Sequence, residues 1–200
     1  MNDKVENCIK DKVEDYIKEN LSKERLEHTY RVRDVAIELA GVFEEEELDL
    51  ELVEIAALMH DAAKEMPEEE KRLYCRLNFI ILDDIFLKDI DLAHGLIASD
   101  MLENIFGCDE VDVLNAVKNH TFGRVKMSLL EKVIFIADYI EPKRKTPGVE
   151  EVREAAFEGK INLSVKLAVD NTMKFLYNND MDVHPMSQGV KSYAASKAEK

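Results

Sequence analysis

This sequence is poor in the residues that break helices and form tight turns, with only seven Gly and four Pro among 200 residues. Asn-Gly and Asp-Gly pairs, which mark β-hairpins, are missing, whereas apolar residues recur at steps of three and four. This apolar spacing runs through a chain whose charged fraction is 34%, which argues against disorder. We therefore predict an all-α fold in one compact domain.

Cysteine is scarce too. Cys8, Cys75 and Cys108 are widely separated and show no CxxC spacing, so neither a disulfide framework nor a thiolate metal site is indicated. A run of about 18 apolar residues and an apolar signal region are also missing, so neither membrane insertion nor export is indicated. These absences favour the cytoplasm.

Positive charge is in short supply, with 27 Lys and Arg against 42 Asp and Glu, for a net charge of −15. Nucleic-acid binding draws its affinity from cations that neutralise phosphates, so a nucleic acid is not the expected partner. Residues 118–145 are an exception, because they hold seven basic and three acidic residues. This segment could attract a small anion locally.

The apolar periodicity predicts a series of helices with boundaries uncertain by roughly two to four residues. Ser22 and Ser128 are expected N-caps, Pro67 suits a first helical turn, and Gly107 can end a helix. We expect an N-terminal helix within 1–21, a main domain over 22–185 and a loosely held tail over 186–200. The predicted helices are 3–19, 23–43, 48–63, 67–83, 91–106, 109–120, 127–141, 149–158 and 161–178.

Several polar side chains share the apolar stripes of these helices. His28, for example, lies four residues before Val32 and seven before Val35, on the face that is expected to be buried. A single buried histidine or aspartate is usually satisfied by a backbone group or an ion pair. Six such residues together are costly to bury unless they are paired or bind a metal. They are His28, His60, Asp61, His94, His120 and Asp138.

Nitrogen and oxygen ligands without thiolates suit a divalent Fe, Mn, Zn or Co ion. The series H28, H60-D61, H94, H120 and D138 resembles the HD-domain superfamily of metal-dependent phosphohydrolases, in the form with two extra histidines for a second metal. The segments RLEHTYRV, LMHDAAKEMP, AHGLIASDML and NAVKNHTFGRVKMSLLEKVIFIADYIEPKR are similar to the YqeK-type symmetrical bis(5′-nucleosyl)-tetraphosphatases. This resemblance covers about residues 22–185. Phe122 departs from it, because a small polar residue is expected there.

The resemblance implies an HD-domain helical bundle with a metal site between core helices. It implies cleavage of diadenosine tetraphosphate into two ADP, with two divalent transition-metal ions, iron in the first place and Mn, Co or Zn as alternatives. His28, His60, Asp61 and Asp138 would hold one ion, and Asp61 would bridge to a second ion held by His94 and His120. We hypothesise that metal-bound hydroxide attacks a phosphorus atom of the inner bridge.

Basic residues near these ligands would act on the substrate. Lys64, one turn beyond Asp61, would stabilise a phosphate or the leaving oxygen, and Arg124 would clamp a phosphate bidentately, although each could also be an ordinary exposed cation. Glu141, one turn after Asp138, would orient a ligand or bind the nucleotide. The expected catalytic set is Asp61, Lys64 and Arg124, and the expected substrate contacts are Lys64, Arg124, Lys126, Glu141 and Arg144.

Two other functions remain open from the sequence. The same metal motif would serve a nucleotidase or phosphodiesterase that acts on mononucleotides or cyclic nucleotides. A non-catalytic nucleotide sensor on a degenerate HD scaffold is the other alternative, and the intact ligand series argues against it. In every case the expected partner is a small nucleotide, with no membrane and no nucleic acid, and a homodimer is left open.

Overall fold

The computed structural model describes residues 3–43 and 48–198, and this part of the chain contains helices and no strand. The elements are α1 (Asp3–Asn20), α2 (Lys23–Val42), α3 (Leu50–Met59), α4 (Glu68–Leu77), α5 (Asp84–Lys88), the 3-10 helix η2 (Ile90–Ala93), α6 (His94–Asn104), α7 (Val111–Asn119), α8 (Leu129–Ile140), α9 (Val149–Phe157), α10 (Ile161–Asn178) and α11 (Pro185–Ala198). The prediction of an all-α fold is confirmed.

Side-chain caps fix where several helices begin. The Ser22 hydroxyl accepts a hydrogen bond from the backbone N–H of Arg25 at the start of α2. Ser128 accepts from the backbone N–H of Glu131, whose carboxylate accepts from the Ser128 backbone N–H in return, which makes a full capping box at α8. These caps satisfy backbone donors that have no partner inside the helix. The sequence predicted both.

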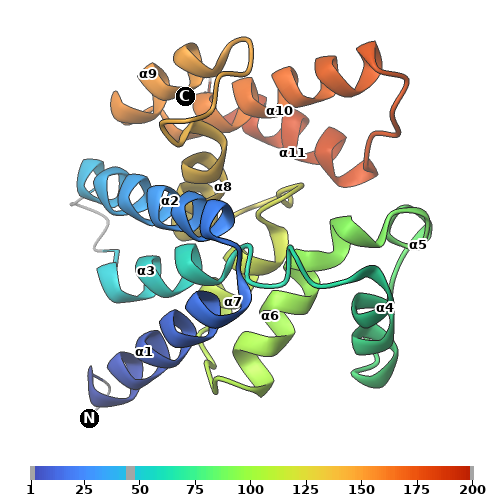
Figure 1. Ribbon diagram of the computed structural model, residues 1–200. Coiled ribbons are helices and arrows are strands. Elements are labelled where there is room, and N and C mark those ends of the chain that lie inside the picture. Colours follow the sequence, from blue (N-terminus) through green and yellow to red (C-terminus); the bar gives the residue numbers. More distant parts are fainter. Residues whose placement is uncertain (1–2, 44–47, 199–200) are drawn as a thin grey trace.

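The central helices surround the position of the polar residues. Helix α2 packs on α3 and α8, and α7 packs on α3, α6 and α8. Val32, Leu39, Ile55 and Ile134 fill the space between them and are fully buried. Helix α1 packs on α3, whereas α9, α10 and α11 form a group at the opposite end of the molecule (Figure 1). All these contacts contribute to one hydrophobic core.

The structure differs most from the predicted elements in three places. The helix predicted over 48–63 ends at Met59, because residues after it form tighter turns such as the Lys64 N–H to Asp61 carbonyl bond of 2.9 Å. The helix predicted over 67–83 ends at Leu77, and α5 follows as a separate short helix. These breaks bring polar side chains to helix ends, where they can face one another.

The third difference concerns the expected loose tail over 186–200. Its described part belongs to α11, which packs against α10 and buries Val190 and Ala194, so this expectation was wrong for residues 186–198. The last two residues lie outside the described part. Two inward apolar side chains in an otherwise polar segment are a weak signal of a helix. The segment therefore gains its order from packing on α10.

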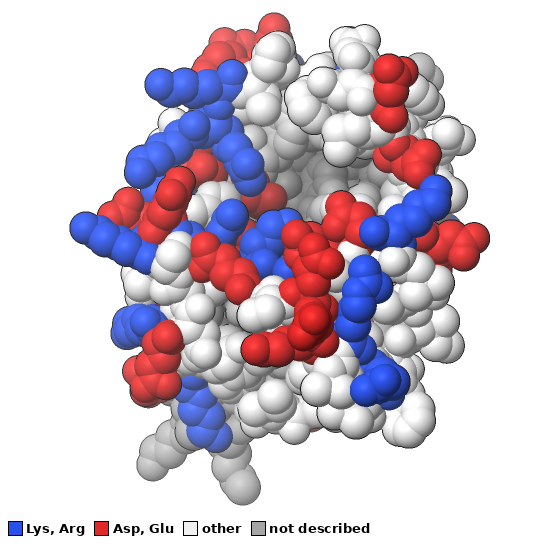
Figure 2. Space-filling view, turned by 45° about the vertical axis from the view of Figure 1, so that its right-hand side comes forward, with Lys and Arg blue, Asp and Glu red and all other residues white. Residues whose placement is uncertain are grey.

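The surface carries both signs of charge. On the face drawn in Figure 2, Lys and Arg side chains alternate with Asp and Glu around a hollow whose visible wall is uncharged. Within the described residues, no helix has the length and apolar character that spanning a membrane requires.

Candidate metal centre

The six polar residues predicted on apolar stripes meet in the middle of the molecule as two clusters. One consists of His28 from α2, His60 at the end of α3 and Asp138 from α8, and the other of Asp61, His94 from α6 and His120 at the end of α7. In each cluster, one potential ligand atom per residue lies within 4.8 Å of the others. All are buried except Asp138, which is half-buried.

The Asp61 carboxylate belongs to the second cluster but also faces the first. It turns one oxygen to the histidines of each cluster. Its Oδ2 atom is 3.6 Å from the Nε2 atoms of both His28 and His60. Its Oδ1 atom is 3.1 Å from Nε2 of His94 and 3.7 Å from Nε2 of His120. A carboxylate in this position can bridge two ions, each held by one of the clusters.

The four histidines all direct the same ring nitrogen towards these clusters. The Nδ1 atoms of His60, His94 and His120 lie 2.6, 2.6 and 2.8 Å from the backbone carbonyls of the residues three positions earlier. The Nδ1 atom of His28 instead faces the Glu141 carboxylate at 3.3 Å. Each acceptor fixes the proton on Nδ1 and leaves Nε2 with a lone pair, which is the arrangement found in metal-binding histidines.

The surroundings of the four Nε2 atoms indicate whether the clusters suit a metal. The Nε2 atoms of His28 and His60 are buried and make no hydrogen bond with the described residues, although that of His28 faces the Asp138 carboxylate, with 3.2 Å between Nε2 and Oδ1. With the proton on Nδ1, a lone pair that faces a carboxylate oxygen or has no partner at all is costly to bury. The Nε2 atoms of His94 and His120 are 3.0 Å apart, and with the protons on Nδ1 two lone pairs face each other. A cation between the nitrogens would relieve both costs, so the residues fit divalent ions.

The charge states of these groups also suit a metal. Burial lowers the pKa of His60 to about 4 despite the nearby carboxylates. Burial would raise the pKa of Asp61, but His60, His120 and His94 outweigh it and hold the pKa well below its usual value. Burial would likewise raise the pKa of Asp138, but His28 and Arg144 lower it. At neutral pH the carboxylates are therefore ionised and His60 is neutral, as metal ligation requires.

His94 and His120 respond differently to the same carboxylate. Burial lowers the pKa of His94, and the hydrogen bond that the protonated ring would donate to the Asp61 carboxylate only partly opposes this effect. Burial would lower the pKa of His120 as well, but its hydrogen bond and attraction to Asp61 raise the pKa above the usual value. A metal ion at this cluster would displace the proton that Asp61 attracts.

The clusters open into a cavity of about 320 Å³, here called the metal cavity. Arg25, Lys64 and Arg144 line it and give it positive charge beside the carboxylates. The Lys64 ammonium lies 3.5 Å from Nδ1 of His94, and Arg144 donates to Asp138 Oδ1 at 2.7 Å. The complete lining is Arg25, Asp61, Lys64, His94, His120, Thr121, Asp138, Tyr139, Arg144, Thr146 and Thr172.

A buried lysine outside the metal cavity holds two of its walls together. Lys71 of α4 is 1% exposed, and its ammonium donates to the Lys64 backbone carbonyl at 2.9 Å. The same ammonium pairs with the side chain of Asp91, whose backbone carbonyl faces Nδ1 of His94. Lys71 therefore fixes the spacing between Lys64 and the start of α6.

Three residues expected at the substrate lie elsewhere. The Arg124 guanidinium donates to both carboxylate oxygens of Glu131, at 2.7 Å for Nε, and does not line the metal cavity. Lys126 is exposed in a left-handed backbone conformation, with φ 63°, and does not line it either. Glu141 is buried between His28 and Arg31, so it faces a ligand and not the cavity. This arrangement corresponds to the orienting role that the sequence also allowed for Glu141.

Arg25 was not among the residues predicted from the sequence. Its Nη1 atom donates to Asp61 Oδ2 at 2.8 Å, and its side chain lines the metal cavity. Arg25 lies three residues before His28, so both side chains share one face of α2. That spacing was the available signal. Phe122, the departure from the expected small polar residue, stacks on His184 with the ring centroids 4.4 Å apart.

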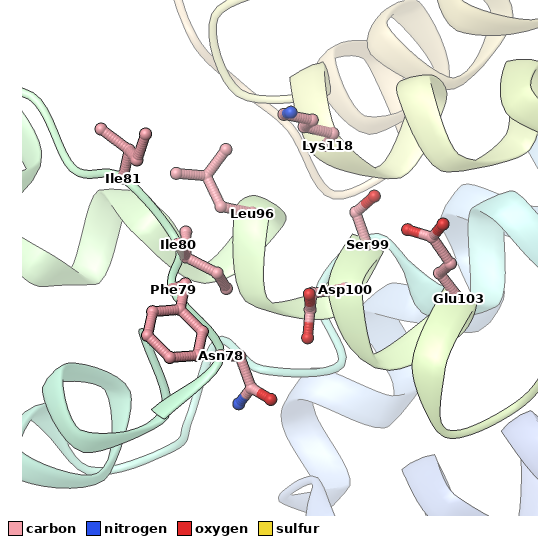
Figure 3. A pocket seen from close by; sticks show the side chains of 9 residues that line it. All are labelled: Asn78, Phe79, Ile80, Ile81, Leu96, Ser99, Asp100, Glu103 and Lys118. Atoms are coloured by element: carbon pink, nitrogen blue, oxygen red, sulfur yellow. The ribbon is translucent and has the colours of Figure 1, made fainter. Parts of the chain in front are cut away.

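Another hollow of similar size, about 380 Å³, lies between the 78–81 loop, α6 and the end of α7 (Figure 3). We call it the Phe79 hollow. Phe79, Ile81, Asp100, Glu103 and Lys118 are among its lining residues, and none of the six predicted ligands belongs to that lining.

Comparisons with known proteins point the same way as the geometry. Residues 25–143 match the family model of the HD domain. A symmetrical bis(5′-nucleosyl)-tetraphosphatase of Bacillus subtilis (strain 168) is 40% identical over 172 residues, which cover 84% of this chain and 88% of that protein. A protein of the same name from Halalkalibacterium halodurans is 37% identical over 169 residues, with the same two coverages.

A solved structure is similar along nearly the whole chain. It is that of a predicted HD superfamily hydrolase involved in NAD metabolism from Clostridium acetobutylicum, with 40% sequence identity and a TM-score of 0.86. The match covers 94% of this chain and 97% of that one.

Proposed function

This chain belongs to the HD domain family, in the group that includes the bacterial symmetrical bis(5′-nucleosyl)-tetraphosphatases, and from this premise we propose that it hydrolyses dinucleoside tetraphosphates symmetrically. Diadenosine tetraphosphate would give two ADP. The observation that carries the proposal is the Asp61 carboxylate between two ligand clusters, because it suits a pair of ions at the floor of a cationic cavity.

Two divalent ions are the proposed cofactors, with iron first. His28, His60 and Asp138 would hold one, His94 and His120 the other, and Asp61 both. When bound, such ions lower the pKa of a coordinated water, so that hydroxide forms near neutral pH, and neutralise phosphoryl charge. Elemental analysis of anaerobically purified protein should find close to two transition-metal ions per chain.

The chain's own residues would orient the polyphosphate. Arg25, Lys64 and Arg144 present cationic groups to the metal cavity, where phosphate oxygens would compete for them with Asp61 and Asp138. Once a phosphate replaces those ion pairs, each cation holds the substrate and not a ligand carboxylate. Lys64 would stabilise the leaving oxygen, and the position of its ammonium beside His94 supports this role.

We propose that the protein binds a small nucleotide as its partner and that it is located in the cytoplasm. The net charge of −15 supports a partner that enters one local cationic cavity over a nucleic acid. The scattered cysteines support a reducing compartment.

The test is a substrate screen with iron, manganese and cobalt added separately. Diadenosine tetraphosphate should yield ADP as its sole nucleotide product. AMP together with ATP would contradict symmetrical cleavage. Faster turnover of mononucleotides or cyclic nucleotides would favour the nucleotidase or phosphodiesterase alternative.

A further inference from the structure

A second cavity adjoins the metal cavity. It has a volume of about 570 Å³ and lies between α10, the start of α9 and the loop after α8. Tyr139, Thr146 and Thr172 line both cavities, so the two lie directly beside each other. Small-molecule sites usually have volumes of about 300–1,000 Å³. The second cavity alone therefore has room for a ligand group of considerable size.

Its chemistry is opposite to that of the metal cavity. The lining surface is mostly apolar, and its two charged residues, Glu151 and Lys174, have opposite signs. The metal cavity contains the cations Arg25, Lys64 and Arg144. A ligand that fills both spaces would thus place its anionic part near the metals and an uncharged, flat or apolar part here.

One face of α10 supplies an aromatic ring and two amides to the second cavity. Asn171, Phe175 and Asn178 follow one another at steps of four and three, so they share a face of the helix. The Phe175 side chain is 59% exposed. An aromatic ring with amides beside it is suited to stack on a heterocyclic base and to hydrogen-bond to its edge.

The opposite wall is held in place before any ligand arrives. Gly148 has φ +81°, and a Cβ atom there would come within 2.5 Å of the Asn171 amide nitrogen. That nitrogen donates to the Gly148 carbonyl at 3.2 Å, and the Val149 N–H closes a turn onto the Thr146 carbonyl at 3.1 Å. The loop is thereby fixed to α10, which lowers the cost of ordering it around a ligand.

We propose that this second cavity binds the base and ribose of one nucleoside half of the substrate, with Phe175 stacking on the base and Tyr139 at the junction with the metal cavity. The inference rests on the proposed function and adds a specificity site to it. The phosphates would extend from Tyr139 towards the ligand clusters, because Tyr139 directly follows Asp138 and lines both spaces.

The experiment compares two aromatic residues of the same helix. Phe175→Ala removes the proposed stacking ring, and Tyr177→Ala is the matched control, since Tyr177 is 58% exposed and lines neither cavity. Binding of ADP and of pyrophosphate, which has no base, is measured by calorimetry on the metal-loaded proteins. Phe175 and Tyr177 are both exposed, so both variants should fold.

Phe175→Ala should weaken ADP binding roughly tenfold, because stacking of a base on an aromatic side chain is lost. Its pyrophosphate affinity should stay within about twofold of the wild type, as should both affinities of Tyr177→Ala. Wild-type ADP affinity in Phe175→Ala would overturn the proposal, and so would an equal loss of ADP and pyrophosphate binding.

Fluorescence provides a second measurement, because the sequence contains no Trp. The emission of Phe175→Trp should change with ADP and not with pyrophosphate, whereas that of Tyr177→Trp should respond to neither. The nucleoside site alone would be refuted if the wild-type protein hydrolyses diadenosine tetraphosphate but the emission of Phe175→Trp does not change with ADP. A wild-type protein that neither binds ADP nor cleaves the dinucleotide would refute the proposed function as well.

Discussion

The metal cavity and the Phe79 hollow are similar in volume, about 320 and 380 Å³, but their polar groups are in different states. In the Phe79 hollow, Asp100 accepts hydrogen bonds from Tyr74 at 2.8 Å and Asn104 at 3.1 Å, and Ser99 donates to a backbone carbonyl. Two of its apolar residues, Phe79 and Ile81, are 90% and 91% exposed.

At the ligand clusters, by contrast, the buried Nε2 atoms of His28 and His60 make no hydrogen bond with the described residues, and that of His28 faces the Asp138 carboxylate at 3.2 Å. Two hollows of similar volume therefore differ in what they can bind. Polar atoms that are already paired gain little from a ligand, whereas buried atoms without partners gain a full interaction. Unsatisfied, pre-oriented groups therefore mark the candidate site better than cavity volume does.

The largest effect should come from Asp61→Asn, which removes the charge that both clusters share. We expect kcat for diadenosine tetraphosphate to fall on the order of 10³-fold, because the bridging ligand would be weakened for both ions. Metal content by elemental analysis should fall as well. Asp100→Asn makes the same change in the Phe79 hollow and should leave both quantities near the wild-type values. Full activity in Asp61→Asn would contradict the bridging role.

Each hollow has one lysine that allows a second comparison. Lys64→Ala should lower kcat roughly 100-fold, because the ammonium beside His94 would no longer stabilise phosphoryl or leaving-group charge. Lys118→Ala removes an exposed lysine from the Phe79 hollow and should change kcat less than about twofold. Steady-state kinetics at saturating metal decide between them. Equal effects would show that Lys64 acts only through general charge.

Glu141→Gln tests the support behind a ligand. The charge that faces Nδ1 of His28 and Arg31 would be lost while the shape is kept, so metal affinity should fall roughly tenfold. Metal titration measures the affinity, and kcat at saturating metal should recover most of the wild-type value. Glu103→Gln, in the wall of the Phe79 hollow, is the control. A substrate-binding role for Glu141 would instead leave metal affinity unchanged and raise KM.

The smallest effect should be one on stability at the Phe79 hollow. Phe79 has φ 55°, a conformation that is costly for a bulky residue, and its side chain is almost fully exposed. Phe79→Asn should therefore stabilise the protein by about 1 kcal/mol and raise Tm by roughly 2–4 °C. Thermal unfolding measures this gain, and activity should be unchanged. A loss of activity would show that the Phe79 hollow takes part in the function.

Much of the fold could be predicted because a helix with one buried face requires apolar residues at local spacings of three and four. The predicted ranges 161–178 and 3–19 agree with α10 and α1 within one residue, since steps of three and four place side chains on one face. Helix α11 was not predicted, because its apolar face is short and is recognised only when α10 lies beside it. The break after Leu77 was missed for a related reason, since apolar residues continue beyond it.

The candidate site likewise contains residues that the sequence could predict and residues that it could not. Periodicity placed His28, His60 and Asp138 on inward faces, and the structure brings them together. Basic residues were harder to place, because a long side chain turns to the nearest carboxylate. Arg124 thus lies on Glu131, while Arg25, unremarked in the sequence, reaches Asp61.

The sequence by itself determined an all-α chain and six inward polar residues, because the helical repeat is a local property of neighbouring residues. Only the tertiary structure decided that Asp61 turns one oxygen to each cluster, that Glu141 supports His28 across 113 positions, and that a second cavity opens beside Tyr139. These depend on how distant helices pack, and packing is set by the whole core and not by any one segment.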